Sequence, residues 1–334
     1  MDEFALIRQY FQSLQRDSSM CGVSVGIGDD CAVLNVPPDR QLVVSIDTLV
    51  EGTHFLPDTP AEQLAWRLLG ASVSDLAAMG ATPAWLTLAL TLPHADESWV
   101  SSFSAALSDA TQQYKIQLVG GDTTRGPLTL TAQVHGFVQT GCALLRSGAK
   151  PGDLVCVTGT LGDSRAGLES LLNDSYLKSA PANHTSPNHM PSAENIEFLR
   201  QRFYRPLPRI STGQLIAPFA SSCIDISDGL LGDLAHILEH SRVGGQINPA
   251  ALPLSDALQA FTDADTAQKW ALTGGEDFEL CFTVPAEQWG NLQAQLQYHK
   301  VPVTAVGAIC DKPGLQLFQA GEWCTVEANG YQHF

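Results

Sequence analysis

Aspartate side chains recur along this chain at the ends of apolar segments or inside them. In the first half, four motifs share this placement: Gly26-Ile27-Gly28-Asp29-Asp30, Ser45-Ile46-Asp47-Thr48, Ser72-Val73-Ser74-Asp75-Leu76-Ala77-Ala78-Met79-Gly80 and Gly120-Gly121-Asp122-Thr123-Thr124. A carboxylate among buried apolar residues needs a partner. Carboxylate oxygens are hard ligands of the kind that Mg²⁺ prefers. These motifs therefore predict a magnesium site if the fold brings them together.

Ordinary structural roles fit single aspartates of this set. Asp47 and Asp122 are candidates for turn or cap residues, and Asp75 is a candidate for pairing with an arginine or with backbone amides. The chain has 35 acidic residues and only 18 basic ones, so basic partners are scarce. We therefore favour divalent cations as the partners of the set as a whole.

A similar motif lies in the second half. Asp225 and Asp228 follow an apolar segment and precede a predicted helix. Either Ser227 or Asp228 is a candidate N-cap for that helix, a role that contributes about 1 kcal/mol. Capping accounts for one of these residues but not for both carboxylates.

A glycine pair precedes two further acids, Glu276 and Asp277. Gly274 and Gly275 allow close approach of the backbone to a ligand, although an ordinary turn is the alternative. The motif is a second candidate ligand loop in this half of the chain.

A nucleotide triphosphate fits a magnesium-binding acidic cleft, because Mg²⁺ bridges carboxylates to phosphate oxygens and neutralises charge during phosphoryl transfer. The chain lacks the Gly-x-x-x-x-Gly-Lys-Ser/Thr motif and the protein-kinase motif set, which argues against those two classes. Gly159-Thr160-Leu161-Gly162-Asp163 is a candidate phosphate loop. Arg146 is a candidate phosphate contact or, equally, a surface arginine.

The overall charge argues against two classes of partner. The 334 residues carry a formal net charge of −17, and such a surface repels nucleic acids and anionic membranes. No apolar run reaches the ~18 residues needed to span a bilayer. Residues 1–16 are predicted as an amphipathic helix without the features of a signal peptide. The eight cysteines form no Cys-x-x-Cys pair and are expected to pack as small apolar residues, so we expect a cytoplasmic protein.

Predicted strands and helices alternate throughout, which indicates an α/β (α+β) fold of two domains. The turn formers from Gly148 to Asp153 place the boundary between residues 1–147 and 148–334. The first half is predicted to contain strands at 31–36 and 41–46, a helix at 61–79, a strand at 85–92, a helix at 97–114, and strands at 116–119 and 128–138. The turn Pro37-Pro38-Asp39-Arg40 is expected to join the first two strands as a hairpin-like connection.

The second half is predicted to contain strands at 154–158, 279–284 and 303–309, with a helix after Asp163. Residues 173–195 are polar and rich in Ser, Pro, Asn and His. A flexible surface insertion is favoured there over a metal site formed by His184 and His189.

Taken together in this order, the acidic motifs resemble those of the thiamine-monophosphate kinases, within the superfamily that includes aminoimidazole ribonucleotide synthetase. The C-terminal Gly330-Tyr331-Gln332-His333-Phe334 is similar to the tail of that family. The resemblance implies a two-domain aminoimidazole ribonucleotide synthetase-like fold, with N-terminal domains that pair their sheets across a homodimer. It implies ATP-dependent phosphorylation of thiamine monophosphate to thiamine diphosphate, the last step of that biosynthesis, by direct in-line transfer assisted by several Mg²⁺ ions.

The resemblance also implies roles for individual residues of this sequence. The implied metal ligands are Asp30, Ser45, Ile46, Asp47, Asp75, Asp122, Asp225 and Asp228. Asp122 and Asp47 are the implied catalytic residues, since each holds metal ions at the reacting phosphate. The implied ATP contacts are Gly121, Asp122, Arg146 and Ser227, and the implied substrate contacts are His54, Glu276 and the position of Ala328.

Two positions depart from the family pattern. Ile46 stands where the family often has threonine, so only its backbone carbonyl is available to a metal. Ala328 stands where relatives can carry an aromatic that packs on the substrate, and Trp323 or Tyr331 are candidates to replace it. The alternatives are another ATP-using enzyme of the superfamily and a non-catalytic nucleotide or metal sensor.

Overall fold

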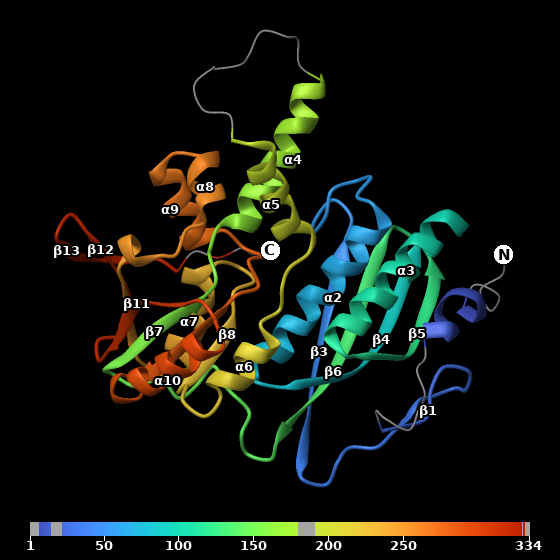
Figure 1. The fold of residues 1–334 in the computed structure, drawn as a ribbon, viewed down its shortest axis with the longest axis horizontal. Helices are drawn as coiled ribbons and strands as arrows, with labels where there is room; N and C mark the ends of the chain where they lie inside the picture. Colours follow the sequence, from blue (N-terminus) through green and yellow to red (C-terminus); the bar gives the residue numbers. More distant parts are fainter. Residues whose placement is uncertain (1–6, 15–21, 180–190, 329, 331–334) are drawn as a thin grey trace. The chain divides into compact units, whose positions relative to one another are not determined.

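The computed structural model describes residues 7–14, 22–179, 191–328 and 330. Contacts within the chain divide it into two compact units, Met1–Ala143 and Leu144–Phe334 (Figure 1). The boundary expected between residues 147 and 148 lies close to this division. None of the described helices is long and apolar enough to cross a membrane.

Unit 1 is built on a four-stranded sheet with the order β3-β6-β4-β5. The strands of this unit are β1 (Val23–Val25), β2 (Val33–Leu34), β3 (Arg40–Val50), β4 (Thr82–Leu92), β5 (Gln117–Arg125) and β6 (Thr129–Gln139). The helices are η1 (Ile7–Phe11), η2 (Gln12–Leu14), α2 (Ala61–Ala78) and α3 (Glu97–Tyr114). Only β4 and β5 pair in parallel within the large sheet.

The two long helices of unit 1 cover one face of this sheet (Figure 1). Side chains of β6 alternate between the faces, so that Leu130, Ala132 and Val134 are buried. A Cβ at Gly136, on the same face of β6, would lie 3.2 Å from Leu76 of α2, which shows how closely that helix packs.

The opposite face of the sheet is open along strand β3, whereas Trp85 of β4 on the same face is buried in a cluster with Val23 of β1. Three side chains of β3 project from it, and Leu42, Val44 and Ile46 are 42%, 50% and 60% exposed. They stand in register with Phe137, His135 and Gln133 of β6. An amphipathic strand in a two-layer unit normally exposes polar residues on its outer face, so this open face is unusual.

The expected hairpin around Pro37 and Pro38 is wrong. The strands on either side of that turn belong to different sheets, because β2 pairs with β1 whereas β3 pairs with β6 over its whole length. Adjacent prolines donate no backbone hydrogen bonds, and β2 has only two residues. The longer ladder with β6 therefore determines where β3 lies. The helix expected over 1–16 falls partly outside the described residues, and its described part forms a π-helical turn and a 3₁₀ turn.

Unit 2 contains a seven-stranded sheet with the order β13-β12-β9-β11-β7-β10-β8. Its strands are β7 (Asp153–Thr158), β8 (Ser222–Asp225), β9 (Gly244–Ile247), β10 (Leu280–Pro285), β11 (Val303–Cys310), β12 (Gly314–Gln319) and β13 (Glu322–Val326). Its helices are α4 (Asp163–Ser179), α5 (Ala193–Tyr204), α6 (Ile210–Ile216), α7 (Leu230–Ser241), η4 (Pro249–Ala251), α8 (Asp256–Phe261), α9 (Ala264–Thr273) and α10 (Ala286–Tyr298).

The core of unit 2 joins the central strands to helix α7. Val155, Ile224, Leu234 and Ile237 belong to one buried apolar cluster. Buried Cys156, Cys223 and Cys281 lie in neighbouring strands, and the seven cysteines within the described residues are all free. The expectation that the cysteines pack as small apolar groups is confirmed for these three buried thiols, whereas Cys31 and Cys142 are exposed.

The polar segment 173–195 is only partly an insertion. Helix α4 extends into it as far as Ser179, and α5 begins at Ala193. His184 and His189 lie outside the described residues.

Candidate functional site

The first acidic group of unit 1 joins strand β3 to helix α2. Ser45 and Asp47 are two residues apart on β3, so they project from the same face of the sheet. Asp75 lies in the last turn of α2, and the Ser45 hydroxyl donates a short hydrogen bond to its Oδ2. The helix and the strand thus bring Asp47 and Asp75 together, as the sequence analysis required.

Asp47 carries an uncompensated buried charge. Burial raises its pKa to about 6, the neighbouring Asp75 raises it further in the same direction, and a hydrogen bond from Ser72 opposes the shift. The Oδ2 atom of Asp47 is buried and has no hydrogen-bond partner. Two carboxylates of like charge with an unpartnered oxygen form a site that a cation would complete.

Ile46 projects from the opposite face of β3 and is largely exposed. Its register partner is Gln133, whereas Asp47 faces Ala132. Its side chain therefore points away from the Asp47–Asp75 pair, and only its backbone is near that group.

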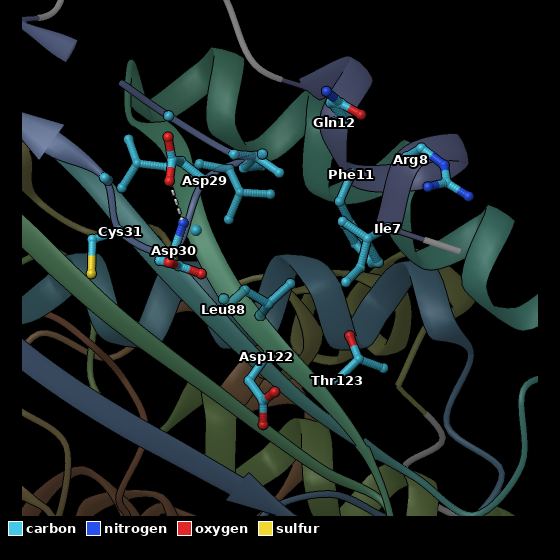
Figure 2. Close-up of a pocket in the computed structure, with 18 of the residues that line it drawn as sticks. Ile7, Arg8, Phe11, Gln12, Asp29, Asp30, Cys31, Leu88, Asp122 and Thr123 are labelled. Carbon is cyan, nitrogen blue, oxygen red and sulfur yellow. Dashed lines mark hydrogen bonds between the residues drawn. The ribbon is translucent and has the colours of Figure 1, made fainter. Parts of the chain in front are cut away.

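The second acidic group of unit 1 lines a pocket of about 570 Å³ (Figure 2). Asp29 and Asp30 come from the loop before β2, and Gly121 and Asp122 come from the edge strand β5. Figure 2 shows Asp29 and Asp30 on one side of the pocket and the η1 residues on the other, with Asp122 below Leu88. The Asp30 backbone N–H donates to Asp29 Oδ1 at 2.8 Å, which closes the tip of the loop.

The rest of this pocket is largely apolar. Short helix η1 contributes Ile7 and Phe11, and the sheet contributes Leu88, Leu90 and Leu118. The polar residues Arg8 and Gln12 of the η1–η2 segment also line the pocket. The pocket has the size and the mixed polarity of a small-ligand site, with acids at one side and apolar walls at the other.

Sheet register separates the two acidic groups. Asp47, Ala132, Leu88 and Gly121 form one row across the four strands, so Asp122 belongs to the next row and projects from the other face of the sheet. Among the residues that the structure describes, no group of three or more His, Cys, Asp or Glu side chains is close enough to hold a metal ion.

Gly121 has a packing reason to be glycine. A Cβ at this position would lie 2.0 Å from the carbonyl oxygen of Leu88 in the neighbouring strand. Any side chain would therefore push β5 away from β4 and displace Asp122.

His54 lies in the turn after β3 and is half-buried. The Val50 N–H donates to its Nδ1 at 3.0 Å, which places the imidazole proton on Nε2 when the ring is neutral. The His54 carbonyl accepts hydrogen bonds from Nε and Nη2 of the buried Arg67, at 3.1 and 2.9 Å. The turn thus fixes the orientation of the ring.

In unit 2, Asp225 ends strand β8, and Ser227 and Asp228 lie in the loop before α7. Neither Ser227 nor Asp228 caps this helix, because the N-cap is Gly229, with a φ of 107° and no side-chain cap. Asp233 holds the loop instead, since its Oδ2 accepts the N–H groups of Ser227 and Asp228, both at 3.0 Å. Burial raises the pKa of Asp233 to about 7.

The segment from Gly274 to Phe278 packs directly against that loop. The Glu276 N–H donates to the Ser227 carbonyl at 2.7 Å, and the Phe278 N–H donates to the Ile226 carbonyl at 2.9 Å. Glu276 and Phe278 adopt left-handed backbone conformations, with φ of 68° and 50°. The structure therefore brings the predicted residues Ser227, Asp228 and Glu276 side by side.

Three backbone amides of the Gly159–Asp163 segment, those of Gly159, Leu161 and Gly162, already donate to groups within unit 2. The Gly162 N–H donates to Asp277 Oδ2 at 2.6 Å, and the Ser164 N–H donates to Asp277 Oδ1 at 3.2 Å. The N–H groups of Gly159 and Leu161 donate to the carbonyls of Pro302 and Pro253. These three amides of the candidate phosphate loop are therefore occupied by partners inside unit 2.

A buried ionic network lies behind the same segment. Fully buried Glu279 accepts hydrogen bonds from Arg202 at 2.9 Å, from Arg209 and from the Thr158 hydroxyl. Arg202 also donates to the Asp277 carbonyl at 3.2 Å. Burial raises the pKa of Asp277 to about 7, and the charge of Arg202 works against that shift.

Arg146 and Ala328 lie at different places on unit 2. Arg146 is exposed, and its positive charge lowers the pKa of nearby Asp233, against the larger effect of burial. Ala328 is exposed in the wall of a hollow of about 510 Å³ beside α7 and β12. Trp323 is 42% exposed and packs on Phe318, and Tyr331 lies outside the described residues.

Comparison with known proteins assigns the family. Residues 28–138 match the model of the AIR synthase related protein, N-terminal domain, and residues 150–319 match that of the C-terminal domain. The chain is 50% identical over 333 residues to a thiamine-monophosphate kinase of Escherichia coli (strain K12), covering 99% of this chain and 98% of that protein. The chain belongs to the thiamine-monophosphate kinase family.

Solved structures of the thiamine-monophosphate kinase family have the same fold. The crystal structure of the Stenotrophomonas maltophilia protein is 41% identical and superposes with a TM-score of 0.83, covering 97% of this chain and 98% of that one. A structure of AaThiL complexed with AMPPCP and TMP is 32% identical with a TM-score of 0.76, covering 99% and 97%. The predicted two-domain aminoimidazole ribonucleotide synthetase-like fold is confirmed.

Three residues behind the ligand loops are not indicated by the sequence motifs: Asp233, Arg202 and Arg209. Asp233 stands five residues after Asp228, within the helix predicted to follow it, and Asp277 directly follows Glu276. The arginines lie 70 or more residues from their Glu279 partner. The closeness of Asp233 to Asp228 in the sequence is a signal that could have identified it, whereas no local signal indicates the two arginines.

Proposed function

We propose that this protein transfers the γ-phosphoryl group of ATP to the phosphate of thiamine monophosphate, forming thiamine diphosphate and ADP. The observation that carries this proposal is the Asp47–Asp75 pair, whose unpartnered buried oxygen calls for a cation at the place where the family resemblance puts one. Family membership supports the choice of substrates.

The donor set fits Mg²⁺. Its members supply only carboxylate, hydroxyl and carbonyl oxygens, which are the ligands that hard cations prefer. In unit 1 the proposed ligands are Asp30, Ser45, the backbone of Ile46, Asp47, Asp75 and Asp122; in unit 2 they are Asp225 and Asp228. Bound Mg²⁺ ions neutralise the phosphate charges that these carboxylates would otherwise repel.

We assign the pocket of unit 1 to the nucleotide. Gly121 and Asp122 lie at its acidic side, where the phosphates would sit, and the walls formed by Ile7, Phe11 and Leu118 suit an apolar flat base. Arg146 and Ser227 of unit 2 are proposed as further ATP contacts. An exposed arginine is suited to bind a phosphate oxygen by charge-assisted hydrogen bonds.

The acceptor is proposed to contact His54, Glu276 and the surroundings of Ala328. His54 carries its proton on Nε2 in the neutral form, so it offers a donor to a phosphate oxygen. The acceptor phosphate oxygen attacks the γ-phosphorus while the bond to the β-phosphate oxygen breaks, and ADP leaves. The acceptor is already an anionic nucleophile, so positioning and charge neutralisation are sufficient and no general base is required.

We propose that the protein acts as a homodimer in the cytoplasm. The open face that carries Leu42, Val44 and Ile46 supports pairing of unit 1 with a second copy, because burying these side chains removes apolar surface from water. The dependence on ATP and the free thiols of the described cysteines support a cytoplasmic location.

A coupled ADP-release assay tests the proposal. Thiamine monophosphate, thiamine and aminoimidazole ribonucleotide precursors are offered separately with ATP and Mg²⁺. We expect ADP and thiamine diphosphate only with thiamine monophosphate. Turnover with an aminoimidazole precursor alone would assign another superfamily reaction, and nucleotide binding without any ADP would indicate a sensor.

A further inference from the structure

Two buried carboxylates in unit 2 accept hydrogen bonds from the backbone and are not assigned to a ligand. Asp233 accepts the N–H groups of Ser227 and Asp228, and Asp277 accepts those of Gly162 and Ser164. Asp233 is 3% exposed and Asp277 is 1% exposed. Each carboxylate therefore fixes one ligand loop from behind: Asp233 the loop with Ser227, and Asp277 the loop with Glu276.

The two loops are joined to each other through the backbone. The hydrogen bond from the Glu276 N–H to the Ser227 carbonyl is 2.7 Å long. A Cβ at Gly275 would lie 2.6 Å from the same carbonyl oxygen, so the segments are in close contact. A displacement of either loop must therefore move the other.

The loop that carries Glu276 needs external support. Glu276 and Phe278 on both sides of Asp277 have positive φ angles, which are unfavourable for residues with side chains. A conformation of this kind persists only where the surroundings hold it. Asp277 stabilises the loop, because its carboxylate accepts hydrogen bonds from two amides at the start of α4.

We infer that Asp233 and Asp277 are positioning residues that set the ATP-contacting loop and the substrate-contacting loop and couple them. The inference rests on the proposed function, which gives Ser227 to ATP and Glu276 to thiamine monophosphate. Neither carboxylate contacts a ligand in this scheme, and each acts through the backbone that it holds.

The two carboxylates differ in how they accept their hydrogen bonds. Both amides at Asp233 donate to one atom, Oδ2. The amides at Asp277 donate to different atoms, Oδ1 and Oδ2. Asparagine has one acceptor oxygen, so it can replace Asp233, whereas at position 277 its NH₂ group would face an N–H donor.

The test measures KM for ATP, KM for thiamine monophosphate and kcat of the full chain carrying Asp233→Asn, Asp233→Ala, Asp277→Asn or Asp277→Ala. We expect Asp233→Ala to raise KM for ATP about tenfold or more, and Asp233→Asn to remain within about threefold of wild type. Both changes at Asp277 should raise KM for thiamine monophosphate about tenfold. The matched control is Asp263→Asn, an exposed N-cap of α9, which should change neither KM.

Several results would overturn the inference while leaving the reaction itself established by wild-type ADP release. One such result is an unchanged KM for thiamine monophosphate in Asp277→Asn. Another is a rise of KM for ATP in Asp233→Asn as large as that in Asp233→Ala. If a variant at 277 does not fold, Gly275→Ala decides, because it keeps both carboxylates and pushes on Ser227. It should raise both KM values together, and a change in neither would overturn the coupling.

Discussion

Both units bury carboxylates, but they treat them in opposite ways. In unit 2, Glu279 is surrounded by Arg202, Arg209 and the Thr158 hydroxyl. In unit 1, Asp47 lies beside another carboxylate and leaves one buried oxygen without a partner. A buried charge that the protein has already neutralised is part of the scaffold, whereas one left uncompensated indicates a ligand.

The largest expected effect concerns the uncompensated group. We predict that Asp47→Asn lowers kcat by about 1000-fold or more, since lost metal-assisted charge stabilisation is worth several kcal/mol. Asp122→Asn, in the separate acidic group at the pocket, should have a similar effect for the same reason. Steady-state ADP release measures the effect, with circular dichroism to verify the fold. A folded Asp47→Asn variant with kcat near that of wild type would contradict the comparison.

Substitutions in the compensated group around Glu279 should lower the stability of the protein more than its activity. Arg202→Met leaves Glu279 and Asp277 short of a buried cationic partner, and we expect it to lower the free energy of unfolding by about 3–5 kcal/mol. Urea unfolding monitored by fluorescence measures this loss. Arg165→Met is the matched control, because Arg165 pairs with Glu169 at the surface and its removal should cost under about 1 kcal/mol.

Mg²⁺ should act on unit 1 as Arg202 acts on unit 2. We expect Mg²⁺ to raise the Tm of the wild-type protein, because an ion that binds only the folded state stabilises it. Asp75→Asn should reduce this rise, and in the absence of divalent cations it should not lower the Tm, because it removes a repulsion from Asp47. Differential scanning calorimetry with and without Mg²⁺ checks both statements. An equal rise in wild type and variant would show that the ion binds elsewhere.

The smallest effect is a dependence of stability on pH. Burial raises the pKa of Asp277 to about 7 in the folded protein, so between about pH 4 and 7 the folded state keeps a proton that the unfolded state has lost. Asp277 alone should therefore make the free energy of unfolding fall as pH rises through this window, with a slope of up to about 1.4 kcal/mol per pH unit, in addition to the contributions of Asp233 and Asp47.

Asp277→Asn should remove its share of that slope and leave the share of Asp233 and Asp47. Asp263→Asn is a useful contrast, because hydrogen bonds from Thr266 lower the pKa of Asp263 and place its contribution at more acidic pH. Denaturant titrations from pH 4 to 8 compare the three proteins. An identical slope in wild type and Asp277→Asn would exclude Asp277 as its source.

Elements with strong local signals were predictable from the sequence. The helix at 97–114 has the predicted bounds, because Asp96 caps its first turn and apolar residues recur at helical spacing. The apolar strand around Cys156 is likewise where it was expected. The hairpin at Pro37-Pro38 was wrong, because the partner of β3 lies about 90 residues later in the chain.

The candidate site divides in the same way. Motif composition indicated which residues could bind a cation, because carboxylates next to apolar segments need partners wherever they end up. It did not indicate that Asp47 meets Asp75 while Asp122 projects from the other face of the sheet, since strand pairing decides that arrangement.

The sequence by itself determined the family, the two-domain fold and the set of acidic residues available for chemistry, because order and composition of motifs are local properties. Only the tertiary structure decided which carboxylates are neutralised and which are not. That balance depends on arginines and amides far away in the chain, such as Arg202 at Glu279 and the amide of Gly162 at Asp277. Burial and pairing are set by packing, which a linear sequence does not display.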